Sequence, residues 1–199
     1  MKAIGAIIAG GQSSRMGGRE KAFLMLAGNS ILAHVIARIG PQVDQLVINA
    51  NGEPARFLEF GLEVVPDALT SLTTPLAGLH AALQFTKRVD ADVLLTVPSD
   101  TPFLPFDLVA RLLEKTGTNY AAIAASGGQE HYIIGAWKTQ LLEGLERAIT
   151  KQDLFRVKDW AHSISAQKVE WPVKPHDPFF NVNAPEDLLR AEQILKTST

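Results

Sequence analysis

Short apolar runs alternate along this chain with longer segments whose apolar residues recur at helical spacing. The runs occupy residues 3–9, 46–48, 62–65 and 91–97. The helical segments cover residues 31–39, 76–83 and 108–113. An apolar run without polar alternation is typical of a strand that is covered on both faces. Repeated strand–helix–strand units therefore predict a three-layer α/β fold, with a mostly parallel sheet and helices on both of its faces, as in Rossmann-like proteins.

The second half of the chain continues this pattern less regularly. Further strands are expected at residues 120–125, 132–137 and 164–169, and further helices at residues 141–149 and 185–195. No repeat, low-complexity tract or long linker interrupts the 199 residues, so we expect a single domain. The less regular stretch, residues 120–178, is a candidate for a lobe that receives a second substrate.

The charge balance and the absence of cysteine limit the class of protein. Lys and Arg total 19 and Asp and Glu total 21, which gives a net charge of −2. Nucleic-acid binding through bulk charge is therefore not expected. No apolar stretch approaches the roughly 20 residues that cross a bilayer, and the apolar N-terminus resembles a buried strand more than a signal peptide. We expect a cytoplasmic protein, although a periplasmic protein can also lack cysteine.

The loop after the first apolar run combines small and basic residues. It contains Gly10, Gly11, Gly17 and Gly18, interleaved with Arg15, Arg19 and Lys21. Glycines let backbone N–H groups approach a phosphate, and the cations add charge-assisted hydrogen bonds, so the loop is a candidate phosphate site. A plain tight turn with solvated basic residues is the alternative. The loop lacks both the Gly-Lys-Ser/Thr ending of P-loop proteins and the glycine spacing of dinucleotide-binding folds.

One acidic residue stands at the end of the strongest expected strand. Asp100 follows residues 91–97 and Pro98-Ser99. A lone carboxylate combined with phosphate oxygens is a usual way to hold Mg²⁺, which prefers oxygen ligands and keeps several waters. The alternative is an ordinary turn aspartate. Next to a phosphate-binding loop, the metal role is the favoured interpretation.

Polar residues also follow two other expected strands. Asn49 follows residues 46–48, and Asp67 follows residues 62–65 and Pro66. Ligands of parallel sheets lie beyond the carboxyl ends of the strands, so both side chains are candidates for ligand contacts. As isolated residues they would more often be turn formers. Residues 75–78 are expected to open the next helix at the same edge, with Gly78 leaving room for a flat ring.

Three residues of the second half are candidates for contacts with a second substrate. Asn181 and Asn183 flank Val182, so both amides point to one face if the backbone is extended. Two turn residues ahead of a helix would give the same pattern. His131 precedes an expected strand and is either a substrate contact or a partly exposed structural histidine.

These segments, taken in order, resemble the nucleotidyltransferases of the molybdenum cofactor guanylyltransferase family. The matching segments are residues 8–17 with Lys21, then residues 49–51, 75–78, 100–103 and 181–188. The likeness spans nearly the whole chain, and the ordered set is far more specific than any single segment. Two positions depart from the family pattern: Glu20 replaces the usual aspartate, and Ala184 replaces a helix-capping threonine. If its amide is not committed to a ligand, Asn183 is a candidate to cap that helix instead.

The resemblance implies roles for individual residues. Catalytic roles fall to Arg15, Lys21 and Asp100, and Asp100 is the implied ligand of Mg²⁺. The implied nucleotide contacts are Ile8, Ala9, Gly10, Gly11, Lys21, Asn49, Asp67, Pro75, Leu76, Ala77, Gly78 and Asp100. Asn181, Asn183 and His131 remain candidates on the acceptor side. Residues 1–105 would form the nucleotide-binding half of the domain, and residues 106–199 the acceptor-binding half.

The resemblance also implies a reaction: transfer of GMP from GTP to molybdopterin or Mo-molybdopterin, with release of pyrophosphate. The implied partners are these substrates, with molybdoenzyme apoproteins or their chaperones as possible recipients of the product. Two alternatives stay open. One is a nucleotidyltransferase with another base or acceptor, such as a cytidylyltransferase or a sugar-phosphate enzyme. The other is a non-catalytic nucleotide-binding adaptor.

Overall fold

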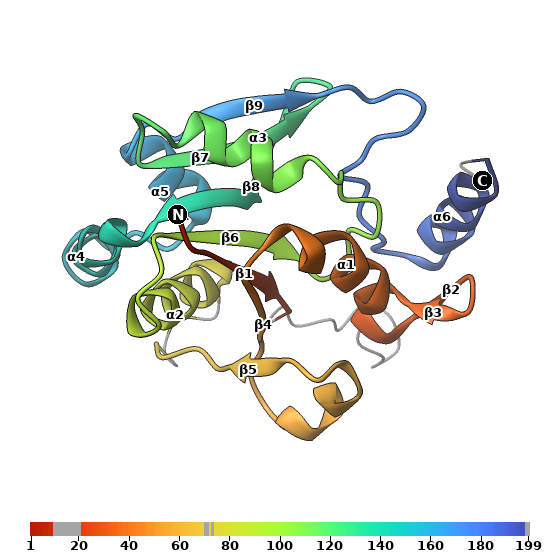
Figure 1. Ribbon diagram of the computed structural model, residues 1–199, viewed down its shortest axis with the longest axis horizontal. Helices are drawn as coiled ribbons and strands as arrows, with labels where there is room; N and C mark the ends of the chain where they lie inside the picture. Colours follow the sequence, from red (N-terminus) through yellow and green to blue (C-terminus); the bar gives the residue numbers. More distant parts are fainter. Residues whose placement is uncertain (10–20, 70–71, 73, 198–199) are drawn as a thin grey trace.

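A computed structural model of the chain describes residues 1–9, 21–69, 72 and 74–197. Its centre is a seven-stranded sheet in the order β5-β4-β1-β6-β8-β7-β9 (Figure 1). The strands are β1 (Ala3–Ile8), β4 (Gln45–Asn49), β5 (Glu63–Val65), β6 (Val93–Pro98), β7 (Ala121–Ser126), β8 (Gln129–Lys138) and β9 (Gln167–Trp171). β5, β4, β1 and β6 pair in parallel, β8 is antiparallel to both of its neighbours, and β9 is parallel to β7. The expected mostly parallel α/β sheet is confirmed.

Helices cover both faces of this sheet. On one face lie α1 (Ile31–Ile39) and α3 (Leu108–Lys115), and on the other α2 (Pro75–Arg88), α4 (Leu142–Gln152) and α5 (Val157–Ser163). In β1 the residues alternate between the two cores: Ala3 and Ile7 pack with the first set, and Ile4 and Ala6 with the second. This burial on both sides explains why the strand is apolar without a break.

Local signals in the sequence explain where the helices begin and end. The Oγ of Ser30 accepts a hydrogen bond from the Ala33 backbone N–H at 3.2 Å and so caps the start of α1. Gly40 and Pro41 end that helix in a single 3₁₀ turn. Pro75 is the first residue of α2, where the missing N–H of proline costs no helical hydrogen bond.

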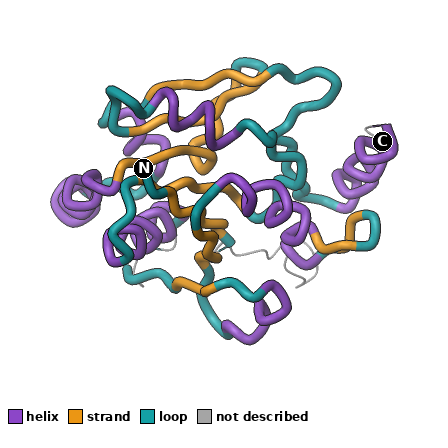
Figure 2. Tube along the Cα trace, viewed as in Figure 1, coloured by secondary structure: helices purple, strands orange, loops and turns teal. Residues whose placement is uncertain are grey.

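A third, smaller core joins the C-terminal helix to the rest of the fold. It contains buried residues of the segments around β2 (Met25–Leu26), β3 (Asn29–Ser30), the loop after β6 and α6 (Pro185–Thr197). Its fully buried or nearly buried members are Leu26, Ile31, Phe103, Val182 and Ala191. Figure 2 shows α6 apart from the other helices, next to the two short strands. This core brings the end of the chain against the loop that carries Asp100.

The structure also departs from the expected elements. The helix α5, the β2–β3 pair and the 3₁₀ segment Pro54–Phe60 are not in the sequence-based assignment. The last strand begins at Gln167 rather than at residue 164, because Ile164 ends α5 and Ser165 has a positive φ of 53°. Among the described residues, no helix is long and apolar enough to span a membrane.

Candidate functional site

The strand register brings the candidate residues of the first half to one edge of the sheet. Ile8, at the end of β1, pairs with Asn49 of β4 on one side and with Pro98 of β6 on the other. Asp100 follows Pro98 by two residues, and Asp67 follows the end of β5 by two. The carboxyl ends of four adjacent parallel strands therefore present these side chains together, where ligands of such sheets bind.

Two asparagines from the end of the chain meet the residues of this edge. Nζ of Lys21 donates a hydrogen bond to Oδ1 of Asn183 at 2.7 Å, and Oγ1 of Thr101 donates to Oδ1 of Asn181 at 2.7 Å. Between them, the backbone N–H of Val182 donates to the carbonyl oxygen of Asp100 at 2.9 Å, and the Val182 side chain is fully buried. The buried valine thus fixes the segment between the two asparagines, and a shared orientation of their amides toward a ligand stays a prediction.

The carboxylate of Asp100 is mostly buried and incompletely satisfied. Its Oδ1 is inaccessible to solvent and has no hydrogen-bond partner within the part of the chain that the structure describes. Burial raises the pKa of Asp100, and the charge of Lys21 and hydrogen bonds from its own backbone and from Thr101 offset part of that rise. A buried carboxylate oxygen without a partner carries an unpaid desolvation cost.

This arrangement fits a divalent cation that also binds phosphate. In the described ranges no group of three or more His, Asp or Glu side chains is placed to hold a metal ion, and Asp100 is the carboxylate that the sequence predicts as a ligand. Mg²⁺ typically binds through one or two carboxylates and substrate phosphates, keeping several waters. A cation bound there would offset the desolvation cost of the unpartnered Oδ1.

A second cluster lies at the ends of β4 and β5. Nδ2 of Asn49 donates to Oδ1 of Asp67 at 2.9 Å and to the carbonyl oxygen of Val65 at 3.0 Å. Only 1% of Asn49 is exposed to solvent. Its NH2 group therefore positions Asp67, while its buried Oδ1 has no hydrogen-bond partner among the described residues. Contacts of Asn49 and of the half-buried Asp67 with a nucleotide stay predictions.

The glycine of α2 has a different neighbour from the one predicted. A β-carbon at Gly78 would overlap Oδ1 of Asn49 and lie 3.3 Å from Cγ2 of Ile8. The space over Gly78 is thus filled by Asn49 and Ile8, and the expectation that it accommodates a flat ring is wrong. Glycine is required there because helix α2 packs directly against the Asn49 amide.

The other predicted nucleotide contacts differ in which of their atoms are accessible to a ligand. The side chains of Leu76 and Ala77 are fully buried in the core under α2, so only their backbone atoms can reach a ligand. Pro75 is exposed at the first position of α2, and Ile8 and Ala9 are half-buried at the end of β1. Among the predicted site residues, Gly10, Gly11 and Arg15 lie outside the described residues.

His131 belongs to a separate contact set. Its Nε2 is 2.8 Å from Oγ of Ser126, which in turn donates to Oδ1 of Asp177 at 2.9 Å, and its ring packs on Phe179 at 4.8 Å. Burial lowers the pKa of His131, while Asp177 and Glu170 oppose that effect. These contacts give His131 a structural function, since its ring packs on Phe179, two residues before Asn181, and its acceptor-side role stays a prediction.

The start of α6 is capped by a residue that the sequence analysis did not assign. Oδ2 of Asp187 accepts hydrogen bonds from the backbone N–H groups of Asn183 and Ala184, both at 2.9 Å. The Asn183 amide oxygen is instead engaged by Lys21. Capping by Asn183 is therefore wrong, and Ala184 is tolerated because Asp187 satisfies the free N–H groups.

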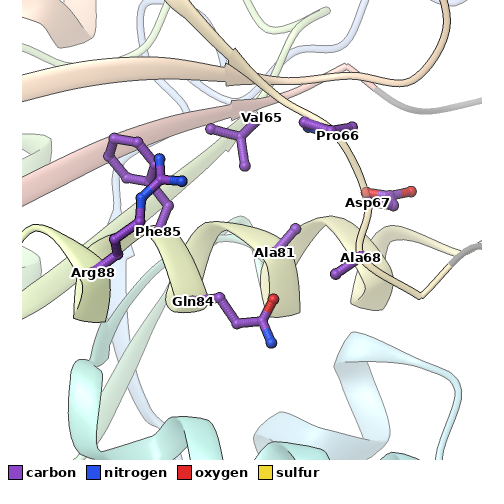
Figure 3. A pocket seen from close by; sticks show the side chains of 8 residues that line it. All are labelled: Val65, Pro66, Asp67, Ala68, Ala81, Gln84, Phe85 and Arg88. Carbon is purple, nitrogen blue, oxygen red and sulfur yellow. The ribbon is translucent and has the colours of Figure 1, made fainter.

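A hollow of about 370 Å³ borders Asp67 on the side of α2. Figure 3 shows its walls, with the loop after β5 lying beside α2. It is lined by Val65, Pro66, Asp67, Ala68, Ala81, Gln84, Phe85 and Arg88. The hollow shares Asp67 with the site, and none of the residues around Lys21 and Asp100 lines it.

Comparison with known proteins agrees with this geometry. A curated relative from Bradyrhizobium sp. (strain ORS 278), named molybdenum cofactor guanylyltransferase, is 45% identical over 96% of this chain and 92% of its own. A relative of the same name from Cereibacter sphaeroides is 41% identical over 98% of each chain. The crystal structure of molybdopterin-guanine dinucleotide biosynthesis protein A from Archaeoglobus fulgidus superposes with a TM-score of 0.74, at 26% identity over 98% of this chain and 99% of that chain.

The family model and the curated relatives identify the chain as a nucleotidyltransferase. The structure of CMP:2-keto-3-deoxy-manno-octonic acid synthetase complexed with CTP has the same fold, with a TM-score of 0.73 at 16% identity over 100% of both chains. The family model described as MobA-like NTP transferase domain matches residues 5–166. The chain belongs to the MobA-like NTP transferase family.

Replacement of Gly78 by alanine is expected to damage both stability and nucleotide binding. The added methyl group must displace the Asn49 amide, and with it Asp67, at a cost of about 1–3 kcal/mol in unfolding free energy. Urea unfolding and calorimetric titration with GTP measure the two effects. Gly144→Ala is the matched control, because Gly144 lies within helix α4 and its β-carbon would meet only Trp160 at 3.4 Å. Equal behaviour of the two variants would contradict this role of Gly78.

Replacement of Asp100 by asparagine is expected to stabilise the chain while abolishing turnover. Burial raises the pKa of Asp100 in the folded chain. The protonated carboxyl group therefore favours folding at low pH, and this contribution is lost as the pH rises through the raised pKa. Above that pKa the carboxylate is charged and lowers the stability of the fold. Removing the charge should add on the order of 1 kcal/mol, or about 2–4 °C in the unfolding midpoint. Thermal unfolding at neutral pH in chelator tests this, and a lower midpoint for the variant would refute it.

Proposed function

We propose that this protein transfers GMP from GTP to the terminal phosphate of molybdopterin or Mo-molybdopterin, forming a guanine dinucleotide and releasing pyrophosphate. The observation that carries the proposal is the convergence of Lys21, Asp100 and Asn183 at the carboxyl edge of the sheet, in a chain of this family. The names of the curated relatives support the same reaction. Delivery of the product to molybdoenzyme apoproteins or their chaperones is part of the proposal.

The reaction exchanges one phosphoanhydride bond for another. A terminal phosphate oxygen of the acceptor attacks the α-phosphorus of GTP, and the bond from that phosphorus to the oxygen of the β-phosphate breaks. The electron pair leaves with pyrophosphate. The attacking phosphate is already anionic, so no histidine base is needed. What remains for the protein is to bring two polyanions together and to stabilise charge on the leaving group.

The charged residues of the site suit this task. Lys21 is fixed by its hydrogen bond to Asn183, so its ammonium group is pre-positioned beside Asp100 and can neutralise phosphate charge without reorganising. Asp100 would hold Mg²⁺ through its unpartnered Oδ1. When bound, the ion supplies Lewis-acid stabilisation of phosphate oxygens. Arg15, which lies outside the described residues, is proposed as a further cation for the triphosphate.

The base is proposed to lie against Asp67. A carboxylate group only accepts hydrogen bonds, and that of Asp67 is oriented by Asn49. Guanine presents two neighbouring donors, the N1–H and the 2-amino group, which match the two oxygens of a carboxylate. Adenine and cytosine present a ring-nitrogen acceptor at that position and would be repelled. The edge around Asp67 and the first turn of α2 is therefore the proposed guanine site.

The acceptor is proposed to approach from the C-terminal half. Asn181 and Asn183 are exposed, and each keeps amide N–H donors beyond the hydrogen bonds that fix its oxygen. They stand beside Asp100 and Lys21, where the terminal phosphate of the acceptor must arrive. His131, whose ring packs on Phe179, is proposed to border this side of the site.

The choice of base is tested by an assay that compares GTP with CTP. With purified molybdopterin and Mg²⁺, pyrophosphate release should be faster with GTP by about 100-fold or more, because a site built to hydrogen-bond one base rejects another. Mass spectrometry should find the guanine dinucleotide as the product. Equal rates with CTP would sink the guanine assignment, and GTP binding without pyrophosphate release would identify a non-catalytic adaptor.

Replacement of Lys21 by methionine keeps the aliphatic stem and removes the charge. The GTP dissociation constant measured by calorimetry should rise about tenfold to hundredfold, since charge-assisted hydrogen bonds to phosphate are lost. Lys138→Met is the matched control, because Lys138 donates to the carbonyl oxygen of Gly117 at the opposite edge of the sheet. An unchanged dissociation constant for Lys21→Met would remove Lys21 from the site.

A further inference from the structure

Asn51 makes a reciprocal pair of hydrogen bonds with Asp67. Its Nδ2 donates to Oδ2 of Asp67 at 2.7 Å, and its Oδ1 accepts from the backbone N–H of Asp67 at 2.9 Å. Asn51 lies two residues beyond the end of β4 and is exposed. The segment that contains it stands out in the sequence, but its side chain has no part in the reaction proposed above. Both hydrogen bonds indicate that the Asn51 side chain orients Asp67.

The two asparagines donate hydrogen bonds to different oxygens of the Asp67 carboxylate. Asn49 donates to Oδ1 and Asn51 donates to Oδ2, so each oxygen receives one amide N–H. A carboxylate has about four lone-pair positions, so about two remain for a ligand. With both oxygens engaged from the protein side, the carboxylate plane cannot rotate freely. The remaining acceptor positions then have a defined direction.

The two asparagines are themselves held in different ways. Asn49 is buried, and helix α2 packs on it at Gly78. Asn51 is exposed, but its backbone carbonyl oxygen accepts a hydrogen bond from Nη2 of Arg56. The chain turns just after it at Gly52, whose φ of +84° favours glycine. Asn49 thus anchors the loop before Asn51, and Arg56 holds the loop at Asn51 itself.

We propose that Asn51 is a positioning residue for base selection, which aligns the Asp67 carboxylate with the N1–H and 2-amino donors of guanine. This inference rests on the proposed function, because it requires that Asp67 contacts the base. Asn51 does not touch the base in this scheme. Its loss would leave Asp67 hydrogen-bonded to Asn49 through one oxygen, free to turn away from two-point contact with guanine.

Inosine triphosphate separates this role from a merely structural one, because it retains the N1–H of guanine and lacks the 2-amino group. We expect Asn51→Ala to weaken GTP binding about tenfold while weakening ITP binding much less, so that the preference for GTP over ITP falls. Asn51→Asp keeps the shape and the acceptor but sets a second carboxylate against Oδ2 of Asp67, and it should reduce the preference at least as much. Calorimetric titration of each nucleotide with Mg²⁺ gives the dissociation constants.

The matched control is Asn119→Ala. Asn119 lies after α3, is partly exposed, and donates locally to the carbonyl oxygen of Lys115 at 2.9 Å. It should keep the wild-type preference. Equal weakening of GTP and ITP in the Asn51 variants, or no weakening of either, would overturn the positioning role.

Asp67→Asn distinguishes failure of this inference from failure of the proposed base site. If Asp67→Asn loses the preference for GTP over ITP but both Asn51 variants keep it, Asp67 reads the base without help from Asn51, and the inference fails alone. If Asp67→Asn keeps the preference, Asp67 does not select the base, and both the proposed base site and the inference on Asn51 are refuted. If Asn51→Ala does not fold, Asn51→Asp decides the question, because it preserves the size and the Oδ1 acceptor of the native residue.

Discussion

The electrostatic attraction between Lys21 and the mostly buried carboxylate of Asp100, with Lys21 held by Asn183, is the interaction on which the site depends. The two ends of the hydrogen bond from Lys21 to Asn183 are 162 residues apart in sequence. The Asp100 carboxylate is held in a place where burial raises its pKa and Lys21 only partly compensates. A small separate core around Val182, Phe103 and α6 maintains this arrangement. The main sheet core alone would not bring the C-terminal segment to the active edge.

The two carboxylates of the site, Asp100 and Asp67, differ in how their oxygens are hydrogen-bonded. Around Asp100 the protein leaves an oxygen unsatisfied, which costs stability and is compensated when a cation binds. Around Asp67 it does the reverse, because amide donors from Asn49 and Asn51 satisfy and orient both oxygens. In the proposed function, the first carboxylate is kept available for a cation, and the second is held fixed for base recognition. This difference matches the separate tasks of charge stabilisation and base selection.

Much of the fold could be predicted from local patterns. Apolar runs without alternation identified β1 and β6, because both strands are covered on two faces. The helix boundaries at Gly40 and Pro75 also followed from breaker chemistry. The short helix α5 was missed because its buried residues are few, and the β2–β3 pair because each strand has only two residues. Such elements are stabilised by tertiary packing and leave little periodicity to detect.

The sequence by itself determined the α/β architecture, the family and the set of polar residues at the strand ends, since these depend on periodicity and on ordered motifs. Only the tertiary structure decided what each of these residues does. Gly78 accommodates the Asn49 amide and not a ring, Asn183 holds Lys21 while Asp187 caps α6, and Asn51 completes the hold on Asp67. The physical reason is that a hydrogen-bond partner distant in sequence leaves no local pattern, whereas burial on a helix or strand face does.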